Sequence, residues 1–162
     1  AEGALAGWSN MGGTAQSLYE EGVKLSFEQW GAGSATAYLA DNTSTEKNYV
    51  DPISEYGGDV SAVSNITIKW DDSATDEQKM ERLITQKWIA MFPNGQEGWS
   101  EIRRTGYPKV FPLAQSTDYS IQVANRIPFD IDEATNNKAN YIKAVQLLKG
   151  NDDYATKMWW QR

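Results

Sequence analysis

TDEQKMERLITQKWIAMFPNGQEGWSEIRRTGYP, from Thr75 to Pro108, is the stretch that decides the fold. Apolar residues recur in its first half at helical spacing, which predicts an amphipathic helix over Thr75–Phe92. Thr75 and Gln78 fit a capping box at the start of this helix, and Pro93-Asn94-Gly95 should end it. A shorter helix is expected over Gln96–Arg104. The apolar stripe of the first helix comprises Met80, Leu83, Ile84, Trp88, Met91 and Phe92.

The residues before this block predict a helical hairpin. Gly13–Trp30 has apolar residues at helical spacing, Thr14 is a suitable N-cap, and Gly31 should stop the helix. The preceding segment resembles the end of another helix, broken at Gly12-Gly13. Two such helices in succession would pack as a hairpin.

The remaining segments are less regular. Residues 32–73 are rich in Gly, Ser, Asn and Asp, and we expect a long loop with one short strand over Asn65–Trp70. After Pro128, a helix should start at Asp132 or Thr135 and run to Leu148 with Gly150 at its end. Its expected buried face consists of Tyr141, Ile142, Val145 and Leu148.

These elements predict a mainly α-helical chain in four parts. They are a hairpin at 1–31, a long loop region at 32–73, the two helices of the opening block at 74–108, and a C-terminal helix and tail at 109–162. A chain of 162 residues fits one domain with its own core.

Composition excludes several function classes. The net charge of −7 disfavours duplex nucleic acid and anionic membrane surfaces as partners. Because the chain has neither His nor Cys, it lacks the ligands of Cys or His zinc sites, a Cys nucleophile, and a His base. Carboxylate chemistry and oxygen-ligated calcium stay open, and neutral ligands such as sugars are compatible with the charge. We expect no cofactor.

Two carboxylates on the shorter helix invite a catalytic interpretation. Glu97 and Glu101 lie one turn apart, and a pair of carboxylates is what a glycoside hydrolase uses as acid and base. The alternative is a structural ion-pair network, in which Arg104 pairs with Glu101 and Arg103 reaches backbone carbonyls. We favour the structural interpretation and expect no catalytic residue.

Aromatic residues are the better candidates for ligand contact, because their faces stack on the apolar faces of sugar rings. In the long loop they are either exposed contacts or anchors that hold the loop on the helices, and loops carry function more often than helices. Trp99 is expected to lock the shorter helix beside Trp88, and either Trp159 or Trp160 should dock the C-terminus. The loop candidates are Tyr38, Tyr49, Tyr56 and Trp70.

Four ordered blocks resemble one family. Gln86–Pro108 resembles the most characteristic block of SusD/RagB-like proteins, and Glu20–Gly31 resembles their last helical hairpin. Arg126-Ile-Pro-Phe129 resembles their R-x-P-Y/F element, and Gly150–Trp160 their C-terminal signature, although Asn151 replaces the usual second Gly. The Glu and Asn residues expected after the third block are Glu133, Asn136, Asn137 and Asn140, and the residues expected to be a structural signature are Trp88, Trp99, Glu101, Arg103, Arg104, Trp159 and Trp160.

The resemblance implies a non-catalytic, helical protein on the cell surface. Members of this family are lipid-anchored to the outer membrane of Bacteroidetes-type bacteria, where they cap a TonB-dependent, SusC-like transporter and deliver starch or other glycans to it. Their N-terminal half has tetratricopeptide-like helix pairs. The resemblance therefore implies that this chain is a C-terminal portion, without the anchor and the N-terminal helical half, and that this half is one of its partners.

Three functions stay open from sequence. The first is a glycan- or nutrient-binding component of an uptake system, which we favour. The second is a glycoside hydrolase that uses Glu97 or Glu101. The third is an interaction module that contacts the transporter without binding sugar.

Overall fold

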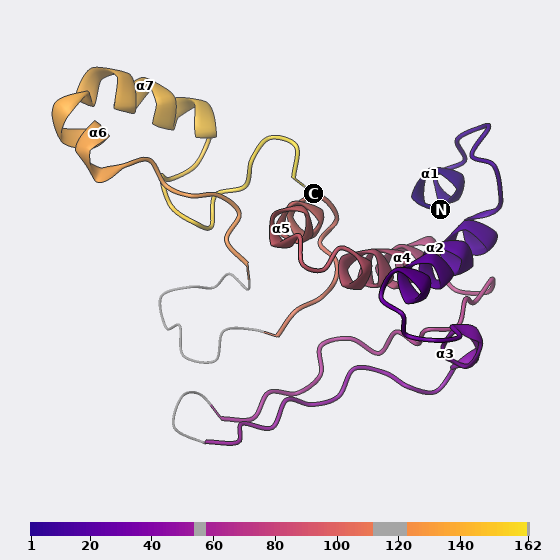
Figure 1. Cartoon of the computed structure of the whole chain (residues 1–162). Coiled ribbons are helices and arrows are strands. Elements are labelled where there is room, and N and C mark those ends of the chain that lie inside the picture. Colours follow the sequence, from indigo (N-terminus) through magenta and orange to yellow (C-terminus); the bar gives the residue numbers. More distant parts are fainter. Residues whose placement is uncertain (54–57, 112–122, 162) are drawn as a thin grey trace.

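The structure is a set of helices joined by long loops (Figure 1). The computed structural model describes residues 1–53, 58–111 and 123–161, which contain seven helices and no β-strand, so the prediction of a mainly α-helical fold is confirmed. None of the helices in these ranges is both long and apolar enough to cross a membrane. The helices are α1 (Glu2–Leu5), α2 (Ala15–Gln29), α3 (Thr36–Ala40), α4 (Asp76–Ala90), α5 (Gly95–Thr105), α6 (Ile131–Asn136) and α7 (Lys138–Leu148).

Helix α4 has the predicted start and a slightly earlier end. The Thr75 side chain accepts a hydrogen bond from the Gln78 backbone N–H, and the Gln78 side chain closes the capping box. The helix ends at Ala90, so the predicted end at Phe92 is two residues too late. Met91 caps the helix with its N–H bonded to the Lys87 carbonyl.

Helix α5 begins and ends at residue types that favour helix ends, Asn94 at the start and Gly106 at the end. The Asn94 side chain accepts a hydrogen bond from the Glu97 N–H at 3.2 Å. At the other end Gly106 adopts a left-handed conformation with φ of 80°, which lets its N–H bond to the Ile102 carbonyl at 2.8 Å. Only glycine adopts this conformation without steric cost.

Substitution of Gly106 by alanine should therefore destabilise the protein by about 1–2 kcal/mol, the cost of placing an L-residue in the left-handed region. Urea unfolding followed by circular dichroism measures the loss. Gly95→Ala is the matched control, because a Cβ there meets nothing within 4 Å and the backbone is not left-handed. An equal loss in both variants would contradict the assignment of Gly106 as a C-cap.

The core lies between α2 and α4 and includes the end of the long loop. Ile84 is fully buried on α4 beside Leu83, and Tyr19 and Val23 face them from α2. Trp70 completes the core, with its ring 5.4 Å from that of Tyr19.

The segment predicted to be a strand over Asn65–Trp70 is an extended loop, so that prediction is wrong. Two of its carbonyls accept hydrogen bonds from helix side chains: the Tyr19 hydroxyl donates to the Ile68 carbonyl at 2.6 Å, and Arg82 Nε donates to the Thr67 carbonyl at 2.9 Å. The Lys69 N–H donates to the Asp41 carbonyl at 2.8 Å, which is a single backbone contact and not a strand pairing. Burial raises the pKa of Tyr19. The one backbone pairing of strand type in the described residues joins Tyr49 and Val60 farther out along the loop.

The N-terminal hairpin is formed, but its first helix ends early. α1 packs against α2, whereas the predicted break at Gly12-Gly13 lies well beyond the end of α1. The chain already leaves the helix after Leu5, and Gly7 has a φ of 77° that permits the turn.

The helix predicted from Asp132 or Thr135 to Leu148 is two helices, α6 and α7, which project from the rest of the molecule (Figure 1). The N-cap is Asp130, whose carboxylate accepts a hydrogen bond from the Asp132 N–H at 2.9 Å. Asn137 interrupts the helix with φ of −134° and ψ of 35°. The C-cap is Lys149, with φ of 55°, one residue before the Gly150 that was expected to end the helix.

The buried face expected for α7 is also wrong, since no residue of this helix is buried and Ile142 is 46 % exposed. The two helices pack on each other, and the Tyr141 ring meets that of Phe129 edge-on at 6.2 Å. The sequence pattern gave the correct helical period but could not show that the contacts of α7 would leave none of its residues buried.

A buried ion pair closes the base of the α6–α7 hairpin. Arg126 Nη1 lies 2.5 Å from Asp152 Oδ1, and both side chains are less than 10 % exposed. The Asp152 carboxylate also accepts hydrogen bonds from the Phe129 N–H and the Tyr141 hydroxyl. Asp152 therefore joins the two ends of the hairpin, the segment before α6 and the segment after α7.

Candidate functional site

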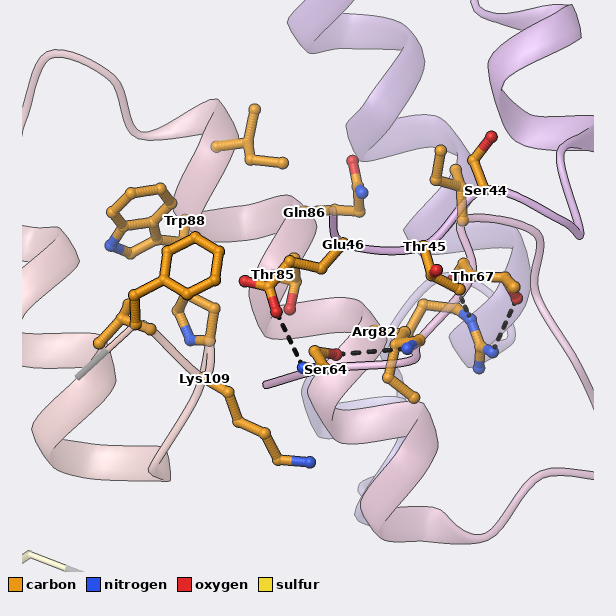
Figure 2. Close-up of a pocket in the computed structure, with 16 residues that line it drawn as sticks. Ser44, Thr45, Glu46, Ser64, Thr67, Arg82, Thr85, Gln86, Trp88 and Lys109 are labelled. Carbon is orange, nitrogen blue, oxygen red and sulfur yellow. Dashed lines mark hydrogen bonds between the residues drawn. The ribbon is translucent and has the colours of Figure 1, made fainter. Parts of the chain in front are cut away.

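A groove of about 390 Å³ separates the long loop from the second half of α4 and the segment after α5 (Figure 2). The loop supplies one wall, α4 supplies the floor, and Trp88 with residues 108–111 supplies the opposite wall. A volume of this size is typical of small-ligand sites. Its lining residues are Ser44, Thr45, Glu46, Ser64, Ile66, Thr67, Ile68, Arg82, Thr85, Gln86, Trp88, Ile89, Pro108, Lys109, Val110 and Phe111.

The loop wall is held in place by Glu46. One carboxylate oxygen, Oε2, accepts hydrogen bonds from the Val63 N–H at 2.6 Å and the Ser64 N–H at 2.9 Å. This contact joins two parts of the loop that are 17 and 18 residues apart in sequence. The half-buried Glu46 therefore fixes the wall and contributes to its surface.

The floor is tied to both walls through Glu81 on α4. Its Oε1 accepts a hydrogen bond from the Ser64 hydroxyl at 2.7 Å, and its Oε2 pairs with Lys109 Nζ at 3.0 Å. Glu81 is 4 % exposed, so it contacts these partners from beneath the groove surface. The groove is thus bridged from loop to helix to the segment after α5.

Arg82 lines the groove but turns its guanidinium toward the loop backbone. Its Nε donates to the Thr67 carbonyl, and Nη1 is buried without a hydrogen-bond partner in the described residues. The side chain is 5 % exposed. A ligand in the groove therefore meets the stem of Arg82 and not its charge.

The opposite wall is aromatic and partly open to solvent. Trp88 is 41 % exposed, and the Phe111 ring packs against that of Tyr49 at 6.3 Å. Gly98 of α5 leaves room for the Trp88 side chain, because a Cβ at position 98 would lie only 2.9 Å from the indole Nε1. The wall therefore presents an indole to the groove from a position that a larger residue at 98 would disturb.

This arrangement suits a ligand with both apolar faces and hydroxyl groups. The aromatic wall provides a stacking surface, and the hydroxyls of Ser44 and Thr45 and the Glu46 carboxylate lie across from it (Figure 2).

The structure places the four loop aromatics that were candidates for ligand contact in different environments. Trp70 is 7 % exposed, and the Tyr38 hydroxyl donates to Gln86 at 2.9 Å while its ring packs against Phe27. The expectation of exposed aromatics is wrong for Trp70, and both residues anchor the loop on the helices. Tyr49 is 47 % exposed beside Phe111 and stays a candidate, whereas Tyr56 lies outside the described residues.

Glu97 and Glu101 do not share a site. Glu97 is exposed at the start of α5, whereas Glu101 is 6 % exposed and pairs with Lys87 at 2.7 Å and Arg104 at 2.6 Å. Burial acts to raise the pKa of Glu101, but the hydrogen bonds from Arg104 and Lys87 outweigh it and hold the pKa below its ordinary value. An acid catalyst needs the opposite shift.

The C-terminal tail is attached to α5 through Arg103. Its guanidinium lies 3.5 Å from the Trp99 ring centre and 4.9 Å from that of Trp160, and Nη1 donates to the Asn125 carbonyl. Trp160 is thus the tryptophan that contacts α5, while Trp159 is 92 % exposed. The Trp99 indole Nε1 donates a hydrogen bond to the Ala124 carbonyl at 2.6 Å, so this residue ties α5 to the segment before Arg126.

Sequence reasoning missed the groove because its parts are distant in the chain. Glu46 lies in a polar loop with no motif around it, and Trp88 was assigned to a buried stripe. No local pattern marked the exposure of Trp88 and Phe92, two members of that stripe. Across residues 1–53, 58–111 and 123–161, no three acidic side chains are grouped so that they could hold a metal ion.

Comparison with known proteins assigns the chain to a family. Residues 1–161 match the model of the SusD-like family, Susd and RagB outer membrane lipoprotein. No curated protein matches the chain.

Solved structures agree over nearly the whole chain. A chitin-binding SusD homolog from Flavobacterium johnsoniae is 48 % identical, with a TM-score of 0.85 over 98 % of this chain and 33 % of that chain. A SusD-like protein from Bacteroides thetaiotaomicron is 47 % identical, with a TM-score of 0.87 over 99 % of this chain and 34 % of that chain. A SusD homolog from Bacteroides uniformis is 44 % identical, with a TM-score of 0.88 over the same shares.

The chain spans about a third of the length of these solved relatives. The resemblance seen in its four sequence blocks is confirmed over the full length of the family match: the chain belongs to the SusD-like family of outer membrane lipoproteins.

Proposed function

We propose that the protein is a non-catalytic component of an outer-membrane nutrient-uptake system and that it binds an oligo- or polysaccharide in the groove. Membership of the SusD-like family supports the first part. The observation that carries the second is the exposed Trp88 wall set across the groove from Ser44, Thr45 and Glu46. The relative from Flavobacterium johnsoniae described as chitin-binding supports a polysaccharide as ligand.

Binding would proceed without covalent change. A sugar ring would stack on Trp88, and hydroxyls of the loop wall would exchange hydrogen bonds with the sugar. Phe111 would extend the aromatic surface, and Tyr49, which packs on Phe111, would support it or contact a longer ligand.

Family membership also supports a proposal for the cellular location of the protein. We propose that the whole protein is lipid-anchored on the outer surface of the outer membrane and works with a SusC-like, TonB-dependent transporter. In this proposal the chain packs against a helical N-terminal region with tetratricopeptide-like pairs. Exposed apolar residues of the described part, such as Trp30 and Phe92, whose rings lie 5.8 Å apart, offer a surface for such contacts.

Affinity electrophoresis on polysaccharide gels, combined with an assay for hydrolysis products, tests the proposal. We expect retention on at least one neutral polysaccharide and no cleavage. Cleavage that disappears in Glu97→Gln or Glu101→Gln would establish a glycoside hydrolase instead. Absence of retention on every polysaccharide would favour the interaction module.

Trp88→Ala should weaken glycan binding about tenfold, which corresponds to about 1.4 kcal/mol, because it removes the stacking surface of the groove. Isothermal titration with the retained glycan measures the change. Trp159→Ala is the matched control, since this indole is 92 % exposed and does not line the groove. Equal affinity of Trp88→Ala and the unmodified protein would place the ligand elsewhere.

A further inference from the structure

The polar side of the groove carries the carboxylate of Glu46, which forms no ion pair within residues 1–53, 58–111 and 123–161. We infer that Glu46 makes the groove selective for neutral sugars over carboxylated sugars by accepting hydrogen bonds from sugar hydroxyls. This inference rests on the proposed function, since it concerns which glycans the groove takes. It follows from three features of the groove: a fixed carboxylate, a free oxygen on it, and cations that are already engaged.

Glu46 is fixed by its own loop. The two backbone N–H groups of Val63 and Ser64 both bind the same oxygen, Oε2. These two hydrogen bonds fix the orientation and the position of the Glu46 carboxylate before a ligand binds. Preorganised groups of this kind bind with less loss of side-chain freedom.

The second oxygen of Glu46 is available to a ligand. In the described part of the chain Oε1 accepts no hydrogen bond, and the residue lines the groove. Figure 2 shows the Glu46 carboxyl group between Ser64 and the side of the groove where Trp88 lies. A carboxylate accepts hydrogen bonds but donates none, so it recognises the O–H groups of a sugar.

The two cations that line the groove are engaged elsewhere. Lys109 pairs with Glu81 at 3.0 Å, and that carboxylate is buried beneath the surface. Arg82 donates from Nε to the Thr67 carbonyl, and its Nη1 is enclosed, so it cannot receive a ligand carboxylate. Of the charged residues that line the groove, Glu46 is the acidic one, and it has no ion-pair partner in the described part of the chain.

A ligand carboxylate in the groove would meet this negative charge without a free cation to receive it. Two like charges at close range repel, and the repulsion grows as the site excludes water. A neutral ring can instead lie between Trp88 and Glu46, with its apolar face on the indole and its hydroxyls toward Oε1. The groove thus combines attraction for hydroxyl donors with rejection of acidic sugars.

The Glu46→Gln variant separates ligand contact from support of the loop. The glutamine carbonyl oxygen can keep both hydrogen bonds from Val63 and Ser64, while an NH₂ group replaces the ligand-facing oxygen. The charge is removed with the loop contact retained. Glu97→Gln is the matched control, because it changes the net charge equally at an exposed position on α5 outside the groove.

The test uses hexamers of N-acetylglucosamine, glucose and xylose as neutral probes and hexagalacturonate as the carboxylated probe, measured by isothermal titration at neutral pH. We expect the unmodified protein and Glu97→Gln to bind the best neutral hexamer at least tenfold more tightly than hexagalacturonate. In Glu46→Gln the affinity for the neutral hexamer should fall about tenfold, and the preference should narrow to threefold or less.

The outcomes distinguish this inference from the proposed function. If the unmodified protein binds neutral hexamers but Glu46→Gln keeps the same preference, the inference is wrong and the proposed function stands. The inference is also wrong if hexagalacturonate binds as tightly as the neutral hexamers. If no probe binds and no polysaccharide gel retains the protein, the proposed function fails and the inference fails with it. Retention of the Val63 and Ser64 amide shifts in the NMR spectrum of the variant verifies that the loop is intact.

Discussion

Replacement of Ile84 by alanine is expected to lower the free energy of unfolding by about 2–5 kcal/mol. Ile84 is fully buried between α2 and α4, where Tyr19, Val23 and Leu83 surround it. Removal of three carbon atoms from this position loses burial and leaves a cavity that rigid helices fill only in part. Urea unfolding followed by circular dichroism measures the loss.

Two variants serve as controls for this prediction. Ile84→Val should cost only about 0.5–1.5 kcal/mol, because it removes a single methylene group. Ile89→Ala removes the same atoms from the same helix at a position that is 49 % exposed, so its effect should be much smaller. Similar losses at positions 84 and 89 would show that the packing of α2 on α4 is not the centre of stability.

Arg126→Leu should destabilise the α6–α7 hairpin by about 3–5 kcal/mol, because it leaves the buried Asp152 carboxylate without its cation. Burial acts to raise the pKa of Asp152, but the hydrogen bonds from Arg126, the Phe129 N–H and the Tyr141 hydroxyl, together with the charge of Arg126, outweigh burial, and the pKa lies below its ordinary value. Native-state hydrogen exchange is the suitable measurement, since it reports opening of α6 and α7 separately from the α2–α4 core.

The double variant Arg126→Leu/Asp152→Leu separates an unpaired charge from lost packing. Replacement of both partners by apolar residues should recover a large part of the lost stability, because no buried charge is left unpaired. Lys143→Ala, an exposed change on α7, should leave exchange unaltered. If the double variant is as unstable as the single one, the pair contributes through shape and not through charge.

Local signals in the sequence predicted the helices well. Each helix cap depends on residues within one turn of the chain, so it can be predicted from neighbouring residues. Examples are the capping box at Thr75 and Gln78, the N-cap Asn94 and the C-cap Gly106. The same holds for Thr14, whose side chain accepts a hydrogen bond from the Ser17 N–H.

Errors arose where long-range contacts decide the structure. The alternation at Asn65–Trp70 fits a strand, but a strand needs a neighbour, and this segment meets the side chains of Tyr19 and Arg82 instead. The apolar period of α7 fits a buried face, but in the described residues α7 packs on α6 and on Phe129, which leave none of its residues buried.

The candidate groove was beyond prediction from sequence for the same reason. Ser64 joins Glu46 to Glu81, and Glu81 pairs with Lys109, yet no short-range pattern connects these four positions. The family resemblance identified the scaffold, whose blocks lie mainly in the helices and the C-terminal tail. It offered no guidance for the loop wall, where the proposed selectivity resides.

The ion pair between Glu2 of α1 and Arg104 of α5 has a consequence for how the chain reaches its native state. The two residues are 102 positions apart, and Arg104 continues through Glu101 to Lys87 on α4. During synthesis or export, in which the chain emerges from N-terminus to C-terminus, Glu2 of α1 appears long before Arg104. At roughly 5–20 residues per second, synthesis alone imposes a wait of about 5–20 s. A helix of four residues is not stable by itself, so we expect α1 to become stable only after the later segments that contact it are available.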